Sequence, residues 1–135
     1  MLQEKQVVTC FLESDGEILI LRRSELVGSY QGRWAGVSGY IEKTADEQTL
    51  TEIAEEVGLS PEEVTLVRKG KPLIIKDERL GVKWVVHPYL FHVKDREKIR
   101  IDWEHNETRW IRPEDIVSYE TVPKLKETLA RVYDI

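Results

Sequence analysis

The stretch GYIEKTADEQTLTEIAEEVGL, residues 39–59, determines most of what the sequence predicts about this chain. Thr44 is a suitable N-cap for a helix, and Glu47 stands three residues later, where a capping box places a carboxylate. Gly58 readily adopts the left-handed conformation that commonly ends a helix, and Pro61 follows soon after. The pattern therefore predicts a helix from Thr44 to Val57.

The predicted helix concentrates negative charge. At about 100° per residue, the apolar residues share one side and three glutamates share the other: Leu50, Ile53, Ala54 and Val57 against Glu52, Glu55 and Glu56. Like charges at this spacing each destabilise a helix by roughly 0.2–0.5 kcal/mol, and no Lys or Arg occurs between residues 44 and 59. A hard divalent cation held by carboxylate oxygens would remove this conflict. An ordinary solvated acidic face is the alternative.

Strands are expected before this helix. Val7–Leu12 is apolar and rich in β-branched residues, and Ser14-Asp15-Gly16 is a strong hairpin signal before the next apolar run, Ile18–Leu21. A continuous run of this kind is typical of a strand buried on both faces. Residues 24–39 are rich in Gly, Ser and Tyr, which favours a loop and a short strand where the backbone approaches something closely.

More strands and a second helix are expected after it. Trp84–Val86 and Tyr89–Phe91 predict a central strand, and Trp110-Ile111 predicts one more short strand. A helical turn is expected to begin at Pro113 or Asp115. A terminal helix is expected from Pro123 to about Val132. Strands interleaved with two helices indicate an α/β layered domain.

Composition narrows the class of protein. The 135 residues, 41% of them hydrophobic, suit one domain spanning residues 1–135. The net charge of −5 does not favour binding to nucleic acid. Cys10 is the only cysteine, so no disulfide forms within the chain. No apolar stretch approaches the roughly 20 residues that cross a bilayer, and residues 1–6 lack the apolar segment of a signal peptide. We therefore expect a cytoplasmic protein with no membrane partner.

The helix resembles a known signature. Nudix (MutT-like) hydrolases carry the pattern G-x5-E-x7-R-E-U-x-E-E-x-G-U, in which U is a bulky apolar residue, and EIAEEVGL at residues 52–59 is similar to its second half. Upstream, WAGVSGYIE at residues 34–42 resembles the W-x-x-P-G-G-x-U-E segment of the family. Downstream, ETRWI at residues 107–111 resembles its E-x-R-W-U strand. The resemblance implies an α/β/α sandwich with a mixed β-sheet.

The sequence also departs from the family pattern. The segment between Gly39 and the helix is two residues shorter, the first glutamate of the box has no counterpart, and Thr51 replaces the arginine. In the family those two side chains pair and brace the loop. Losing both is self-consistent, because neither charge is left unmatched. The glutamates that bind metal are all retained, which favours a working site.

The resemblance implies specific roles. Glu52, Glu55 and Glu56 would bind Mg²⁺ or Mn²⁺, with the carbonyl of Gly39 as a further ligand. The metal would activate water to attack phosphorus in a nucleoside diphosphate-linked substrate such as a nucleoside triphosphate, ADP-ribose or a nucleotide sugar. The catalytic base would be Glu55, Glu56 or an acid on a later loop. Glu104 is the main candidate for that acid, and Asp102 and Glu107 compete with it.

Substrate contacts are less specific. Arg22 and Arg23 follow a strand where related proteins place an arginine near the phosphates, and strand alternation allows only one of them to face the cleft. Tyr30, Trp34 and Trp84 are candidates to stack on a base, although core packing is the commoner role of an aromatic residue. His105 lies beside Glu104, and a structural role is the favoured interpretation of that histidine.

Two other functions are compatible with the sequence. A catalytically silent Nudix-fold domain that binds or senses a nucleotide would explain Thr51 and the missing glutamate. An acidic interaction module would explain the helix as a chance match. A homodimer is compatible with the sequence, which contains no signal for or against it.

Overall fold

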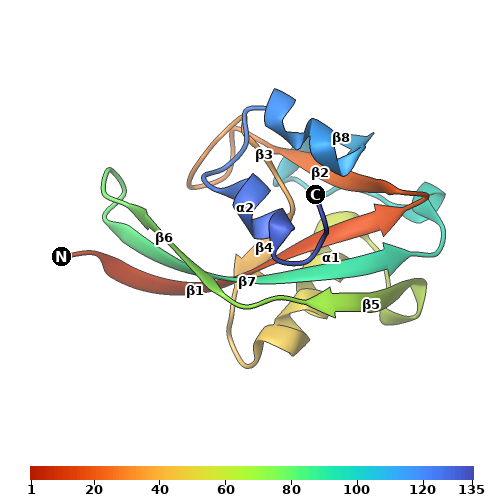
Figure 1. The fold of residues 1–135 in the computed structure, drawn as a ribbon, viewed down its shortest axis with the longest axis horizontal. Coiled ribbons are helices and arrows are strands. Elements are labelled where there is room, and N and C mark those ends of the chain that lie inside the picture. Colours follow the sequence, from red (N-terminus) through yellow and green to blue (C-terminus); the bar gives the residue numbers. More distant parts are fainter.

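A mixed eight-stranded sheet lies between helices in the computed structural model, which describes all residues 1–135 (Figure 1). The strands are β1 (Gln3–Ser14), β2 (Glu17–Arg23), β3 (Trp34–Ala35), β4 (Val37–Tyr40), β5 (Val64–Lys69), β6 (Leu73–Asp77), β7 (Val82–Val93) and β8 (His105–Ile111). The helices are α1 (Ala45–Val57) and α2 (Leu125–Ala130), with 3-10 turns η1 (Pro61–Glu63), η2 (Arg96–Lys98) and η3 (Pro113–Ser118).

The long strands β1 and β7 form the centre of the sheet. They run parallel, in a register that extends from the Gln3–Val82 pair to the Glu13–His92 pair. Every other pairing between two of these strands is antiparallel. The second edge of β1 is shared, since β4 pairs with its middle and β2 with its end. The glycine-rich segment is thereby placed directly beside the central strand.

The hairpin expected at residues 14–16 is present. Asp15 and Gly16 have φ angles of 53° and 78°, the left-handed conformations that a tight two-residue turn between antiparallel strands requires. The strand after it is buried on both faces as expected, since Ile18 to Leu21 are all buried. The 3-10 turn begins at Pro113, one of the two expected positions.

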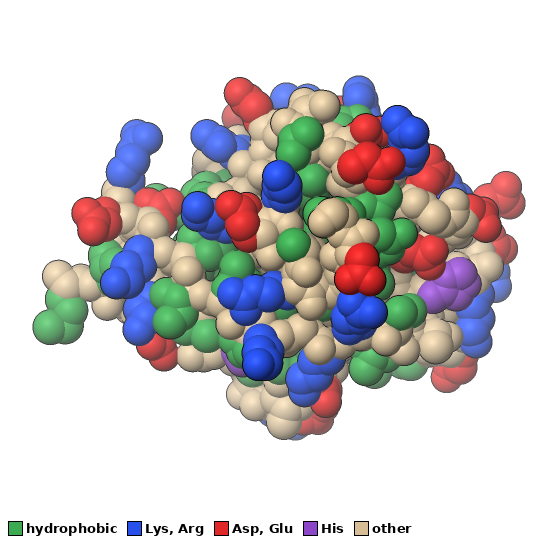
Figure 2. All heavy atoms as spheres, in the orientation of Figure 1, with side chains coloured by type: hydrophobic (Ala, Val, Ile, Leu, Met, Phe, Trp, Pro, Cys, Tyr) green, Lys and Arg blue, Asp and Glu red, His purple; other side chains and the backbone are tan.

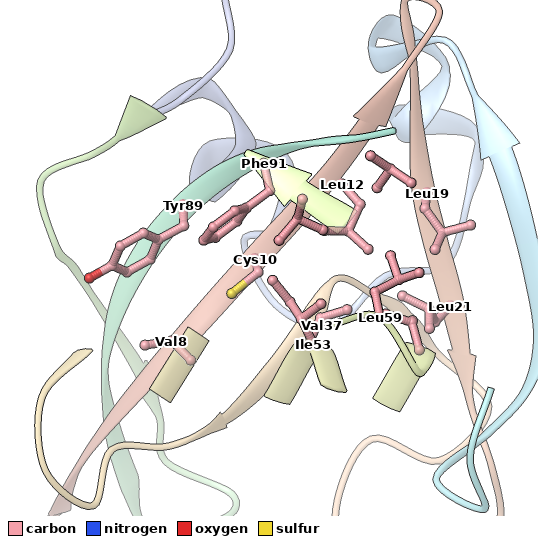
Figure 3. Packing of buried hydrophobic residues seen from close by; sticks show 13 residues of the cluster. Val8, Cys10, Leu12, Leu19, Leu21, Val37, Ile53, Leu59, Tyr89 and Phe91 are labelled. Carbon is pink, nitrogen blue, oxygen red and sulfur yellow. The ribbon is translucent and has the colours of Figure 1, made fainter. Parts of the chain in front are cut away.

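Alternation along β1 builds two cores, one on each face of the sheet. Val8, Cys10 and Leu12 pack with Ile53 and Val57 of α1 (Figure 3). On the opposite face, another cluster packs beneath α2 and η3: Phe11, Ile18, Ile20, Leu90, Ile111, Ile116, Leu125 and Leu129. The α/β/α sandwich with a mixed sheet that the sequence resemblance implied is confirmed.

The expected division of α1 into an apolar side and an acidic side is wrong in part. Ala54 is exposed, whereas Glu56 is buried with 1% of its surface accessible. The reason is that α1 also lies beside β4, so that its packed face extends beyond Ile53 and Val57 to Glu56. One of the three glutamates therefore enters the protein interior.

The hairpin of β6 and β7 extends past the helices together with the start of β1 (Figure 1). We call residues 73–86 the wing. Val7, Leu73, Ile75 and Val86 form a small apolar cluster on it.

Figure 2 shows acidic, basic and apolar side chains interspersed over the face that carries α2. None of the helices has the length and apolar character needed to cross a membrane.

Candidate active site

A cavity of about 710 Å³ lies where β4, the start of β1, the wing and the loop at residues 27–30 meet. Its volume is in the usual range for small-molecule sites. Carboxylates of Glu52, Glu55 and Glu104 line it, together with Arg23. The other lining residues include the aromatic Tyr40 and Trp84 and the charged Lys5 and Glu42. We call this space the acidic cavity.

Glu52 is held on two sides. The Nε2 atom of Gln48 donates a hydrogen bond of 2.6 Å to its Oε2 atom. Its carboxyl group also lies directly against Gly39, because a Cβ atom placed on Gly39 would come within 2.2 Å of the carboxyl carbon. The glycine at position 39 thus leaves the space that the Glu52 carboxylate occupies.

Glu56 is buried without full compensation for its charge. Its Oε1 atom accepts a long hydrogen bond of 3.4 Å from the Ser38 amide, and its Oε2 atom has no partner. Burial raises the pKa of Glu56 well above its ordinary value, and contact with Glu52 adds to this effect. His105 Nε2, also without a hydrogen-bond partner, lies 3.7 Å from Oε1.

Glu55 and Glu104 also belong to the acidic lining. Glu55 is exposed on α1, whereas Glu104 comes from the loop before β8. The backbone amide of Ser24 donates a hydrogen bond of 2.7 Å to the Glu104 carbonyl, which fixes this loop beside the end of β2. Burial raises the pKa of the Glu104 carboxyl, and the charges of Asp102 and Glu52 raise it further. The structure therefore brings Glu104 to the same cavity as the helix glutamates.

These residues have the character of a divalent-cation site. No three His, Cys, Asp or Glu side chains lie close enough together in this structure to hold a metal ion by themselves. However, Glu56 has an unpaired buried oxygen beside the Glu52 carboxylate, and no Lys or Arg forms an ion pair with Glu52, Glu55 or Glu56. Oxygen donors that lack a cationic partner fit Mg²⁺ or Mn²⁺, which keep several waters as ligands.

The two arginines at the end of β2 point in different directions, as alternation predicts. Arg23 lines the acidic cavity, and its Nε donates to the Ser29 carbonyl at 2.9 Å. Desolvation lowers the pKa of Arg23, while Glu56 and Glu104 oppose that change. Arg22 lies outside the cavity, where it pairs with Glu107 at 3.6 Å. The expectation for Arg22 as a substrate contact is therefore not supported by its position.

Tyr30 and Trp34 occupy different environments. Tyr30 lines the cavity, but its hydroxyl donates to Asp77 at 2.7 Å and accepts from Trp84 Nε1 at 3.1 Å. It therefore ties the 27–30 loop to the wing. Trp34 is buried against Tyr119 in the α2 core and does not line the cavity. This position does not support Trp34 as a residue that stacks on a base, and it agrees with the alternative of core packing.

Sequence reasoning missed Lys5 and Tyr40, whereas Trp84, one of its candidates to stack on a base, does line the cavity. Tyr40 is 54% exposed and stacks with Trp84 at 6.2 Å between ring centroids. The Lys5 ammonium lies 5.4 Å from the Tyr40 ring and 5.9 Å from the Trp84 ring. Alternation gives Lys5 and Val7 the same face of β1, but only the β1–β4 and β1–β7 registers bring the two aromatic rings to it.

The comparisons with known proteins agree with this architecture. A family model described as NUDIX domain matches residues 3–132. The chain is 24% identical to nucleoside triphosphatase NudI of Escherichia coli over 95% of its length and 96% of that protein.

Solved structures with the same fold include the MutT protein from Methanosarcina mazei Go1. It has a TM-score of 0.76 and 22% identity, with 96% of this chain and 93% of that chain covered. A Caenorhabditis elegans Ap4A hydrolase, solved as a binary complex, has a TM-score of 0.75 and 16% identity, with 94% and 93% covered. From the family match across nearly all of its residues, the chain belongs to the Nudix hydrolase family.

Proposed function

We propose that this protein is a metal-dependent pyrophosphohydrolase, which cleaves the phosphoric anhydride bond of a nucleoside diphosphate-linked substrate by attack of water on phosphorus. The observation that carries this proposal is the meeting of Glu52 and Glu55 with Gly39 and Arg23 at one cavity, with the buried carboxylate of Glu56 in contact with Glu52. The carboxylates form no ion pair with Lys or Arg and are therefore available to a metal ion. The guanidinium of Arg23 lines the same cavity and is suited to binding phosphate.

Glu52, Glu55 and Glu56 would hold Mg²⁺ or Mn²⁺, and the Gly39 carbonyl is a further candidate ligand. When bound, such a cation neutralises diphosphate oxygens and lowers the pKa of water. Arg23 binds a phosphate oxygen through its guanidinium, because its Nε is already committed to Ser29 and its remaining donors are free to face the cavity.

Glu104 is the favoured general base among the loop acids. Its carboxylate lines the cavity, is partly desolvated and can accept a proton from the attacking water. Asp102 is committed elsewhere, since its Oδ1 contacts both the Glu104 amide and the His105 ring. Glu107 pairs with Arg22 and Arg109 outside the cavity. Glu55 remains the alternative on α1, because it too is exposed to the cavity.

The base of the substrate is assigned to the aromatic surface of Tyr40 and Trp84. These rings lie on the same cavity as the carboxylates, and the accessible face of Tyr40 suits stacking by a nucleobase. The relatives named nucleoside triphosphatase and Ap4A hydrolase support a nucleoside polyphosphate as the substrate class. Among the candidate substrates, a nucleoside triphosphate is therefore the first choice.

A hydrolysis panel tests this function. Nucleoside triphosphates, dinucleoside polyphosphates, ADP-ribose and nucleotide sugars would be incubated with Mg²⁺, Mn²⁺ or EDTA in water enriched in oxygen-18. We expect metal-dependent release of a nucleoside monophosphate from at least one substrate, with the label in a phosphate product. No turnover of any substrate with either metal would overturn the proposal.

A catalytically silent nucleotide-binding domain is the second candidate. Thr51 in place of the family arginine, and the shorter segment before α1, favour it. In the same panel, such a domain would be stabilised against thermal unfolding by metal and nucleotide without releasing any product.

A further inference from the structure

We infer that Gln48 is a positioning residue that sets the orientation of Glu52 for metal binding, and that it does so with a neutral amide in place of a charged brace. This inference rests on the proposed metal site. Gln48 lies in the first turns of α1, and its side chain is buried with 6% of the residue accessible. A buried amide at this place must have its polar atoms paired.

Both ends of the Gln48 amide are paired, and to different segments. Its Oε1 accepts from the backbone N–H of Glu42 at 3.1 Å, in the connection between β4 and α1. Its Nε2 donates to Glu52 Oε2 at 2.6 Å, one helical turn along α1. The partners define the amide orientation, because a backbone N–H can only donate and a carboxylate can only accept.

Glu52 therefore has a fixed position. The Gln48 amide holds one of its oxygens, while Gly39 limits the other side of the carboxyl group. Through its second hydrogen bond, Gln48 ties this carboxylate to the connection that begins just after Gly39 and Tyr40. Gln48 thus connects the segment that follows Gly39 to the Glu52 carboxylate, which itself lies against Gly39.

A neutral brace also preserves the charge of the site. A lysine or arginine in contact with Glu52 would compete with a divalent cation for the same carboxylate. An amide contributes a directed hydrogen bond and leaves the negative charge uncompensated. Gln48 therefore explains how a chain with Thr51 and a shorter connection keeps Glu52 in place. Outer partners of metal ligands typically change metal affinity by 10–100-fold when they are removed.

The test is the affinity for Mn²⁺ of Gln48→Met, measured by calorimetry on the full chain without substrate. Methionine keeps the length and volume of the side chain but cannot make either hydrogen bond well. We expect binding about tenfold or more weaker than in the wild type. In assays, the Mg²⁺ concentration for half-maximal rate should rise while kcat recovers at saturating Mg²⁺.

The matched control is Thr49→Val, which removes another buried hydrogen bond of α1, from Thr49 Oγ1 to the Asp46 carbonyl, away from the carboxylates. It should lower thermal stability without changing the affinity for Mn²⁺. If Gln48→Met binds Mn²⁺ as tightly as the wild type, the inference is overturned. If the wild type itself binds no Mn²⁺, the proposed function fails instead.

A measurement on the wild type covers the case in which Gln48→Met does not fold. In nuclear magnetic resonance spectra, the side-chain amide protons of Gln48 should exchange slowly with solvent compared with those of exposed Gln3. They should also broaden first when Mn²⁺ is added. Rapid exchange like that of Gln3, or no response to Mn²⁺, would contradict the assigned role.

Discussion

At the scale of single residues, burial separates the three glutamates of α1. Glu55 is exposed, Glu52 is partly buried and Glu56 is fully buried with an unpaired oxygen. Burying a carboxylate without a partner costs free energy of folding unless the carboxylate binds a cation or takes up a proton. A functional role would explain why this chain keeps a buried, unpaired carboxylate at Glu56. Glu56 contacts Glu52, which lines the acidic cavity.

Glu56→Gln tests that use. Because glutamine is neutral, the variant should unfold in EDTA at the wild-type temperature or above it. Its kcat/KM should fall by more than about 100-fold, since a metal ligand is lost. Glu55→Gln should also lose most of its activity with its folding intact.

Circular dichroism melts and initial rates supply the measurements for these variants. Glu47→Gln is the matched control, because this glutamate on the same helix accepts a hydrogen bond from the N-cap hydroxyl of Thr44 and does not line the cavity. Full activity of both Glu55→Gln and Glu56→Gln would rule out the assignment of the site.

The two arginines of β2 provide a second test at this scale. Arg23→Met should raise KM for a nucleotide about tenfold or more, because a charge-assisted contact to phosphate is lost. Arg22→Met should stay within about twofold of the wild type, because Arg22 pairs with half-buried Glu107 outside the cavity. Steady-state kinetics of Arg23→Met and Arg22→Met measure the two values of KM. Equal effects of the two substitutions would contradict the assignment of Arg23.

At the scale of elements, local sequence signals predicted α1 well. Its expected range was Thr44–Val57, and the structure gives Ala45–Val57 with Thr44 as N-cap and Gly58 in the left-handed conformation. These signals are local hydrogen bonds and a local φ angle, so no tertiary contact is needed to read them. The burial of Glu56 was not predictable in the same way. It depends on β4, which packs against α1 only in the folded chain.

Gly39→Ala tests the contact between these two elements. The added methyl group would displace the Glu52 carboxyl group, which is the flexible end of a side chain, so the variant should fold. Its affinity for Mn²⁺ should fall by about tenfold, because Glu52 must leave its position. Gly28→Ala is the matched control, since nothing lies within 4 Å of its added Cβ atom. Calorimetry that gives the same affinity in Gly39→Ala and the wild type would disprove the contact.

At the scale of the whole molecule, the acidic cavity is assembled from segments far apart in the chain. The glutamates of α1 and the motif around Gly39 were predictable because their residues are close in sequence. Lys5, Tyr40 and Trp84 meet only through the pairing of three strands. Trp34 was a candidate to stack on a base, yet it packs in the α2 core, which is the commoner role of an aromatic residue. The register between strands that are far apart in the chain cannot be read from the local sequence of any one of them.

Tyr30→Phe tests how the 27–30 loop and the wing enclose the cavity. The substitution removes the hydrogen bonds of the Tyr30 hydroxyl to Asp77 and Trp84. Burial raises the pKa of Tyr30 to about 12, so the wild-type phenol stays protonated and donates throughout the neutral range. We expect a loss of about 1 kcal/mol in stability, faster amide exchange at residues 27–30, and a higher KM with little change in kcat. Unchanged exchange and KM would mean that this link does not close the cavity.

The most direct measurement is a crystal structure with Mn²⁺, located by its anomalous scattering. We expect one or more manganese ions at the acidic cavity, bound by carboxylate oxygens of Glu52, Glu55 and Glu56 close to Gly39. Manganese bound elsewhere, with these three side chains turned toward bulk solvent or unliganded, would contradict it.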